Sequence, residues 1–261
     1  MSIEFISQSS LGQFLRCPVQ WERRWVYNEI LPPGIAARRG SSVHHAAEIN
    51  HAQKVTSMVD LPVDELMDAA RDEFVRLIKE RGVFIPKDQV GEKNRLLAEG
   101  LDGSVRLTKL YRAELAPTIQ PAIVEKRIYM DVGLGVPLAG TIDVLDINHA
   151  LIDMKTAAKS KAQGDADKSL QLSFYSGLVA DDTGKWPTDI SLNVLVDLKE
   201  PKMQVLHTKR GPDDFQKLMG RIQFMLAQVE AGLFPPCPPD SWICSPVWCG
   251  WWSSCKWGGQ R

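Results

Sequence analysis

Long apolar runs are missing from this sequence. None approaches the roughly 18 to 20 residues that a membrane-spanning helix needs. The first residues, MSIEFISQSS, also lack a basic segment followed by an apolar stretch, so no secretory signal is expected. Excess positive charge is absent too, because the formal net charge is −1. Neutral charge neither indicates nor excludes nucleic-acid binding, since a local basic groove suffices. We therefore expect a cytoplasmic protein whose partner is not revealed by bulk charge.

Cysteine is scarce except near one end of the chain. Four of the five cysteines lie in the last 25 residues, and the fifth is near the start: Cys17, Cys237, Cys244, Cys249 and Cys255. In a chain without an export signal, such clustering indicates ligation of a metal or a metal cluster more than disulfides.

The chain is long enough for one sizeable core, and its composition (44% hydrophobic, 24% charged) is that of an ordinary globular protein. Apolar periodicity predicts a helix over 9–28, or two short helices separated at Pro18. A loop over 30–39 then precedes a helix that starts near Gly40. Two further helices are expected at 62–81 and 89–115.

After Pro121 the spacing of apolar residues changes from helical to alternating. Alternating residues predict strands over 122–132, 136–147 and 150–155, joined by short turns into an antiparallel meander. A helix over 168–180, strands over 189–198 and 202–209 and a helix over 212–232 follow. This order predicts an α/β fold with a central sheet. We expect one domain over 1–261, with a helical part (1–118), a catalytic α/β core (119–232) and a Cys- and Trp-rich tail (233–261).

Asp143, Asp153 and Lys155 form the most informative cluster. The two aspartates lie on adjacent predicted strands, and residues 153 and 155 share a face of their strand. Two carboxylates side by side repel unless a cation lies between them, and hard oxygen ligands suit Mg²⁺ or Mn²⁺. Such an ion can polarise a phosphodiester and activate water. From the spacing alone, a partly buried salt bridge explains the cluster equally well.

The stretches G-T-I-Asp143 and I-Asp153-M-Lys155-T resemble the PD-(D/E)xK nuclease superfamily, and more narrowly its RecB-type exonuclease branch. Other motifs follow in the order of that family: Gly40-S-S-V-His44, Glu125 in the preceding strand, and Gln171-L-S-F-Tyr175 on the following helix. The resemblance implies a restriction-endonuclease-like fold, in which a central mixed sheet is flanked by helices.

The resemblance also implies roles for these residues. His44, Asp143, Asp153 and the main-chain carbonyl of Met154 would hold the metal, and Lys155 would activate water and stabilise charge. Glu125 would hold a second metal or orient a water, or else would pair at the surface with a neighbouring basic residue. Gln171 and Tyr175, four apart on one helix face, would contact DNA phosphate or order Lys155.

Cys244-x4-Cys249-x5-Cys255, together with Cys17, resembles the cysteine arrangement of the iron–sulfur members of this family, the AddB-type helicase–nucleases and the CRISPR spacer-acquisition nucleases. The resemblance implies a four-iron four-sulfur cluster that ties the first helix to the tail. The usual spacing is closer to C-x2-C-x5-C, and Cys237 is an extra thiol. Zinc, which also takes four thiolates, is the alternative.

The function implied is a Mg²⁺- or Mn²⁺-dependent DNA exonuclease acting on single strands or duplex ends. Recombination, repair, phage DNA processing or CRISPR adaptation would be its context, in a bacterial or phage-infected cell. No G-x4-G-K-[ST] segment is present, so a helicase or recombination partner would supply any motor. Candidate phosphate contacts are Arg38, Arg39, Lys159 and Lys161. The alternatives are a catalytically silent DNA-binding module and a zinc-ribbon interaction protein. The sequence leaves the oligomeric state open.

Overall fold

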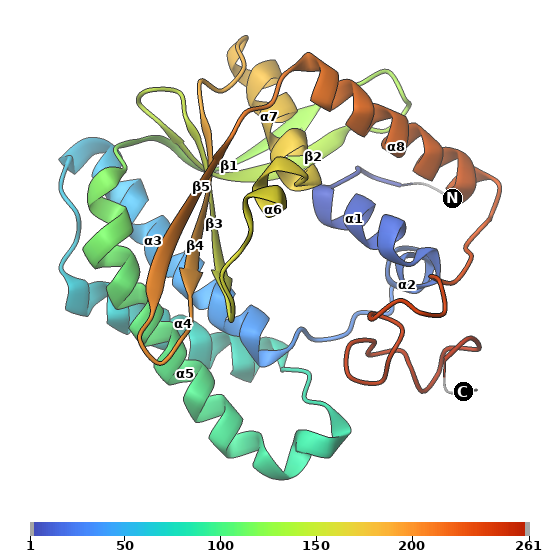
Figure 1. Cartoon of the computed structure of the whole chain (residues 1–261), viewed down its shortest axis with the longest axis horizontal. Coiled ribbons are helices and arrows are strands. Elements are labelled where there is room, and N and C mark those ends of the chain that lie inside the picture. The colour runs from blue at the N-terminus through green and yellow to red at the C-terminus, as the bar shows by residue number, and fades with distance from the viewer. Residues whose placement is uncertain (1–2, 259–261) are drawn as a thin grey trace.

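A computed structural model of the chain describes residues 3–258, apart from the side chain of Lys87. Its centre is a five-stranded sheet in the order β1-β2-β3-β4-β5 (Figure 1). The first three strands form the predicted antiparallel meander, β3 and β4 are parallel, and β4 and β5 are antiparallel. The predicted α/β fold with a central mixed sheet is therefore confirmed. The strands are β1 (Pro121–Met130), β2 (Leu138–Asp146), β3 (Leu151–Ala157), β4 (Ile190–Val196) and β5 (Lys202–Thr208).

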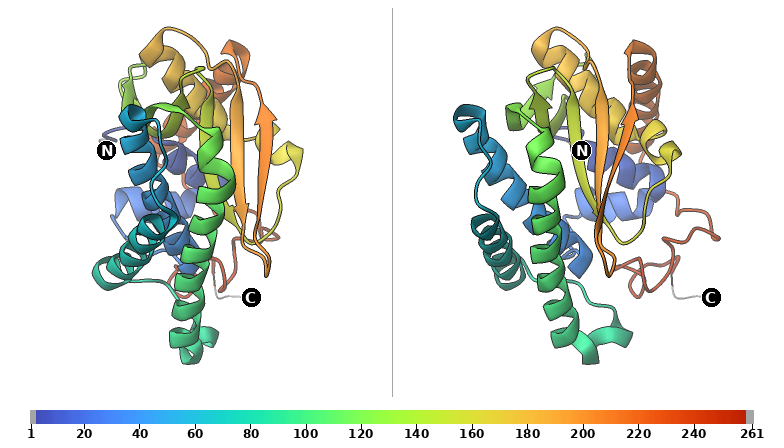
Figure 2. Two further views of the ribbon diagram at one scale, coloured as in Figure 1. Left: turned by 90° about the vertical axis from the view of Figure 1, so that its left-hand side faces the viewer. Right: turned by 60° about the vertical axis from the view of Figure 1, so that its left-hand side comes forward.

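Helices cover both faces of the sheet (Figure 2). One layer is formed by α3 (Ile35–Ser57), α4 (Val63–Arg81) and α5 (Lys93–Leu110), and the other by α1 (Gln8–Arg16), α7 (Leu170–Thr183) and α8 (Pro212–Glu230). Shorter elements complete the described chain: α2 (Pro18–Trp21), α6 (Gln163–Asp167), π-helical turns at Glu22–Val26 and Tyr111–Leu115, and 3-10 turns at Lys87–Glu92 and Ala116–Thr118.

Two apolar cores hold these layers together. Strand β3 contributes to both, because Leu151 packs with Phe174 of α7 on one face, while Ile152 packs with Val43 of α3 on the other. In the sequence, a strand that is buried on both faces has consecutive apolar residues, such as Leu151 and Ile152. The charged residues that follow in β3 are therefore held in a fixed place at the end of a doubly covered strand.

Two helix boundaries differ from the expectations. The first helix is broken, because Cys17 is extended (φ −160°) and Pro18 starts α2, so the version with two short helices holds. Helix α3 begins at Ile35 and not near Gly40. Gly34 has the extended backbone of a residue just before a helix, and Ile35-Ala36-Ala37 can enter the first turn directly. The predicted loop over 30–39 is therefore wrong for its second half, 35–39, and holds over 30–34. Helix α6 also lies where a loop was expected.

Among the described residues, no helix is both long enough and apolar enough to cross a membrane.

A buried polar network joins α3 to the end of α5. Asn50 donates to the Tyr111 hydroxyl at 2.9 Å, and that hydroxyl lies 2.9 Å from His51 Nε2. Because the Tyr111 oxygen already accepts from Asn50, its proton is free to bond to an unprotonated His51 nitrogen. Burial, helped by the nearby Lys54 ammonium, lowers the pKa of His51 to about 4.

His51 should therefore make the protein sensitive to acid. Unfolded, its pKa is near 6.5, so the unfolded chain takes up a proton first as the pH falls. The stabilisation is complete above about pH 6.5 and is lost towards pH 4, by about 3 kcal/mol in the free energy of unfolding. Urea unfolding of His51→Gln across this range should show a shallower loss than the wild type. His207→Gln, at an exposed histidine, is the control. Identical pH slopes for His51→Gln and wild type would contradict this account.

Candidate active site

The family motifs converge on one open cleft of about 710 Å³. It is lined by residues of α3, of the middle of β1 and β2, and of the end of β3, with Tyr175 of α7 at its border. Its lining includes His44, Glu48, Glu125, Asp143, Lys155 and Tyr175. Five separate elements, namely α3, β1, β2, β3 and α7, thus bring titratable side chains to one place.

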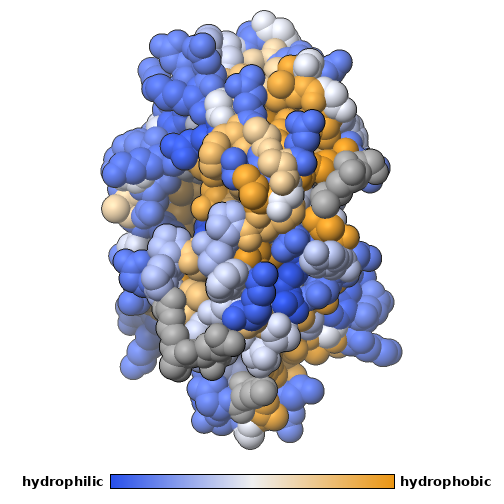
Figure 3. Space-filling view, turned by 90° about the vertical axis from the view of Figure 1, so that its right-hand side faces the viewer, coloured by the Kyte–Doolittle hydropathy of each residue, from blue (hydrophilic) through white to orange (hydrophobic). Residues whose placement is uncertain are grey.

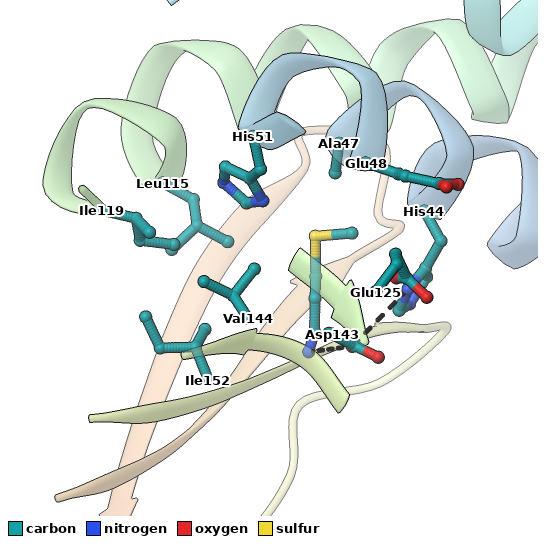
Figure 4. Close-up of a pocket in the computed structure, with 11 residues that line it drawn as sticks. His44, Ala47, Glu48, His51, Leu115, Ile119, Glu125, Asp143, Val144 and Ile152 are labelled. Carbon is teal, nitrogen blue, oxygen red and sulfur yellow. Dashed lines mark hydrogen bonds and ion pairs between the residues drawn. The ribbon is translucent and has the colours of Figure 1, made fainter. Parts of the chain in front are cut away.

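His44, Glu125 and Asp143 form the innermost group. One ligand atom from each lies within 4.8 Å of the other two, and among the described residues no other set of three does so. The Asp143 carboxylate accepts the Met154 main-chain N–H at 3.0 Å and lies 3.6 Å from His44 Nδ1, as drawn in Figure 4. One imidazole and two carboxylates fit a divalent cation. The sequence prediction placed Asp153 in the ligand set and gave Glu125 a second metal or a water; in the structure Glu125 lies within this group of three, and Asp153 lies beside it.

Asp153 lies beside this group and is held by two donors. Lys155 Nζ is 3.0 Å from each of its oxygens, and Gln171 Nε2 donates to Oδ1 at 2.9 Å. The Oδ2 atom receives no well-aligned hydrogen bond among the described residues, although the carboxylate is 1% exposed. A buried carboxylate oxygen without a full partner is uncommon and leaves one lone pair available to a cation.

Glu125 has the most strained backbone of the site. Its φ is +46°, which is rare for a residue with a side chain. The register of β1 against β2 is also interrupted near its start, between Pro121 and Ile123. Strain of this kind costs about 1–3 kcal/mol and is found most often at functional sites. The distortion places the Glu125 carboxylate beside Asp143.

Burial dominates the electrostatics of the site. It raises the pKa of the Asp143 and Asp153 carboxyls, against the nearby Lys155 ammonium, which lowers them. Burial likewise raises the pKa of Glu125 to about 8, with Asp143 adding to the shift. It lowers the pKa of His44 to about 4, and the Lys155 charge acts in the same direction. The raised pKa values mean that nearby positive charge does not fully compensate the burial of the three carboxyl groups. His44 is neutral, as a metal ligand must be.

Helix α7 supports Lys155 and Asp153 from one side. Gln171 and Tyr175 lie one turn apart, and Tyr175 lines the cleft. The helix approaches closely because Gly140 of β2 has no side chain. A Cβ there would lie 2.7 Å from Leu178 Cδ1 and 3.0 Å from Tyr175. Gln171 thus contacts the carboxylate that pairs with Lys155, which matches the ordering role weighed for it.

Helix α3 approaches from the opposite side in the same manner. A Cβ on Gly40 would lie 3.0 Å from Thr156 Oγ1 of β3. His44 follows one turn later, and the Met154 main chain is close enough to its ring to raise the pKa of the imidazole. The metal-ligand roles of His44 and of the Met154 carbonyl stay predictions.

The four basic residues named as phosphate contacts are placed differently. Arg38 is buried and donates to the main-chain oxygens of Arg81 and Gly82. Arg39 forms an ion pair with Asp197, which also binds Arg106. Both guanidinium groups are thus engaged inside the protein. Lys159 and Lys161 are exposed on the loop after β3, outside the residues that line the cleft.

Glu48 is a cleft residue that the sequence reasoning missed. It lies on α3 one turn after His44, and its charge helps to raise the pKa of Glu125. It also lines a small enclosed space of about 10 Å³ behind the site, shown in Figure 4 with His51, Leu115 and Ile119. The signal was available, because residues 44 and 48 share a helix face.

All five cysteines gather at a second place, between α2 and the tail. Cys237 contacts Cys17 and Cys244, and Cys249 lies near Cys17 and Cys255. Gln20 donates to the Cys249 sulfur at 3.2 Å. The thiols expected to be ligands are therefore neighbours, and Cys237 is among them and not apart.

Comparisons with known proteins bear on the fold and the family. A candidate exonuclease from Eubacterium rectale has a crystal structure that matches with a TM-score of 0.60 at 13% identity, over 92% of this chain and 86% of that one. At such low identity the likeness shows the fold alone. SSO0001 matches at 16% identity over 80% of this chain and 95% of that one, with a TM-score of 0.36, too low to support a conclusion. No curated protein gives a significant match.

The profile of the PD-(D/E)XK nuclease superfamily matches residues 6–256, which is nearly the whole chain. That span contains the cleft, Asp143 on β2, the Asp153–Lys155 pair on β3, and the cysteines at both ends. The chain therefore belongs to the PD-(D/E)XK nuclease superfamily.

Proposed function

We propose that this protein is a Mg²⁺- or Mn²⁺-dependent DNA exonuclease of the RecB type, working as one domain. The observation that carries the proposal is the juxtaposition of two groups in one cleft. His44, Glu125 and Asp143 offer ligand atoms within 4.8 Å of one another. Beside them, Lys155 lies 3.0 Å from the Asp153 carboxylate. A salt bridge alone would account for the second group but not for the first.

The position of each residue in the cleft suggests its role in the proposed reaction. A bound divalent ion would supply positive charge to the phosphodiester and lower the pKa of an attacking water. His44, Glu125 and Asp143 would hold that ion, with the Asp153 carboxylate, which Lys155 contacts, beside them. Lys155 would orient the water and stabilise charge on the phosphate oxygens. Asp153 and Gln171 fix the Lys155 ammonium, and Tyr175 borders the space that the substrate would occupy.

We further propose that the cysteines hold a four-iron four-sulfur cluster through Cys17, Cys244, Cys249 and Cys255. One buried polar group supports a bound cluster at this place. The indole N–H of Trp251 is buried beside the cysteines with no acceptor among the described residues. Cluster sulfur would be such an acceptor.

The natural context proposed is DNA recombination, repair, phage DNA processing or CRISPR adaptation, with a helicase or recombination partner as the motor. Single-stranded DNA or duplex ends are the expected substrates.

The direct test is cleavage of end-labelled single-stranded, blunt duplex and circular DNA by the purified protein in Mg²⁺ or Mn²⁺. We expect nucleotides or short products from linear DNA, no cleavage of circles, and none in EDTA. Cutting of circular DNA would contradict exonuclease action. DNA binding without cleavage in either ion would favour the silent DNA-binding module.

Metal binding should release protons near neutral pH. Because the pKa of Glu125 is about 8, its carboxyl is largely protonated at pH 7 and must ionise to bind a cation. Titration calorimetry with Mn²⁺ in buffers of different ionisation enthalpy should show a release of roughly one proton per ion. Glu125→Gln should bind more weakly and release fewer protons, whereas Glu99→Gln, at an exposed site, should match the wild type. Equal release by all three would contradict the role of Glu125.

A further inference from the structure

A groove of about 950 Å³ opens beside the cleft, and we call it the side groove. Its walls come from four distant parts of the chain: the loop before α3 with the first turns of that helix, the segment from Phe84 along α5 to Arg106, Asp197 after β4, and the tail from Val247 to Trp251. Ala36 and Ala37 line both the side groove and the cleft. The two spaces therefore adjoin at the first turn of α3, so a chain molecule bound in the cleft can extend over this turn into the side groove.

The walls of the side groove are held in place by close contacts. Phe84 donates its main-chain N–H to the Pro33 oxygen at 3.0 Å. Leu31 packs against the tail so tightly that a Cβ on Gly250 would lie 2.5 Å from Leu31 Cδ1. On α5, a Cβ on Gly100 would lie 2.6 Å from Ile35. The side groove is thus preformed, which lowers the cost of ordering a ligand in it.

The lining of the side groove suits flat apolar groups better than phosphates. Phe84, Trp248 and Trp251 present aromatic rings, and Trp248 is 64% exposed. The two arginines of the wall, Arg39 and Arg106, are both occupied by Asp197. Asp102 adds negative charge, and Glu99 is paired with Arg95, so the wall offers phosphates no unpaired arginine deep in the groove.

Exposed apolar side chains alone would not identify this site. Apolar residues also form a broad orange band on the face that carries α8 and the tail (Figure 3), and Phe224 of α8 is 56% exposed. The side groove differs because it is concave, adjoins the cleft and is lined by aromatic rings. At the junction, the first turn of α3 has no side-chain cap, so its main-chain N–H groups favour an anion there.

We propose that the side groove binds the unpaired bases of the DNA strand whose phosphodiester lies in the cleft. The proposal rests on the nuclease function proposed above and makes the substrate a single strand at this point. Aromatic planes recognise bases by stacking, and stacking needs bases whose faces are free of a duplex. The adjoining of the two spaces places the backbone at the α3 junction, while the bases turn toward Trp248.

The test compares a long and a minimal substrate. Fluorescence anisotropy with a labelled 20-nucleotide oligo(dT) in Ca²⁺ reports strand binding. Hydrolysis of bis(p-nitrophenyl) phosphate in Mn²⁺ reports the cleft alone, since this diester is too small to reach the tail. Trp248→Ala should raise the Kd for oligo(dT) about 5- to 100-fold and leave hydrolysis of the small diester unchanged. Val247→Glu, at a residue that is 49% exposed, should weaken oligo(dT) binding by adding negative charge.

Phe224→Ala is the matched control, and it should leave both readouts at the wild-type level. The melting temperature of each variant checks the fold. An unchanged Kd for oligo(dT) in both groove variants, with small-diester hydrolysis intact, would overturn the side-groove proposal and leave the nuclease function standing; the groove would then be free to bind a protein segment. Absence of both DNA binding and diester hydrolysis in the wild type would overturn the proposed function and the side groove together.

Discussion

Replacing Asp143 by asparagine should lower the rate of DNA cleavage at least about 1,000-fold without unfolding the protein. Asp143 belongs to the group of three ligands, and its carboxylate also accepts the Met154 N–H at 3.0 Å. Asparagine keeps the shape and can still accept that hydrogen bond through its amide oxygen. It removes the negative charge that a divalent cation needs.

The same substitution should leave the metal-free protein at least as stable as the wild type. Burial raises the pKa of Asp143, so the ionised carboxylate is destabilising in the folded state once the pH exceeds the unfolded value near 3.8. A neutral side chain removes that cost. Mn²⁺ should then raise the melting temperature of the wild type more than that of Asp143→Asn, because the ion stabilises a folded protein only to the extent that it binds it.

Three measurements together distinguish a loss of catalysis from a loss of folding: the cleavage rate, the melting temperature without metal, and the change in melting temperature with Mn²⁺. Asp181→Asn, at an exposed aspartate of α7, is the control for the change of side chain. Lys155→Ala is a poorer test, because it strands the buried Asp153 carboxylate, at a cost of about 3–5 kcal/mol. Cleavage by Asp143→Asn within tenfold of the wild type would refute the assigned site.

Cys17→Ser should cause the largest loss of stability. Under the cluster proposal, Cys17 is the thiol of the first helical segment that binds together with three thiols of the tail. Linking positions 17 and 255 closes a loop of most of the chain, and a link of that length is worth about 5 kcal/mol in the chain-entropy model. The variant should lose iron, lose absorbance near 400 nm, and expose the tail to protease.

Cys237→Ser provides a closely matched comparison, because Cys237 contacts Cys17 and Cys244 and is equally buried. If Cys237 is not a ligand, this variant should keep its iron and its melting temperature within a few degrees. Iron retained in Cys17→Ser but lost in Cys237→Ser would reverse the ligand assignment. Stoichiometric zinc in a colourless wild-type protein would instead replace the cluster.

Local pattern predicted the strands and the neighbours of Lys155 well. Alternation located β1 to β3, and short turns fixed their antiparallel order, so Asp143 and Asp153 were expected to be close. The helix spacing of Gln171 and Tyr175 likewise fixed their common face. These features depend on contacts between residues close in sequence, which periodicity records.

Features that depend on distant contacts could not be read in the same way. The left-handed backbone of Glu125 has no sequence signature, because glutamate rarely adopts it. Arg39 looked like a free cation, and only the fold reveals that Asp197, at the end of β4, binds it. The start of α3 was misplaced because Pro32, Pro33 and Gly34 indicate a loop, whereas contacts of Ile35 with α5 extend the helix to that point.

The contact between Leu31 and Gly250 links the tail of the chain to the helix that carries part of the proposed metal site. Leu31 lies just before α3, the helix that carries His44, and Gly250 lies between two of the tail cysteines. If the tail is released, the segment before α3 loses its contact with Gly250. The helix that positions His44 is then held less firmly. Thermodynamic linkage is reciprocal, so an ion at His44 must in turn favour the docked tail by the same free energy. An oxidant that destroys a cysteine-bound cluster would therefore weaken metal binding at the cleft, and a nuclease built this way would lose activity under oxidative conditions before it unfolds.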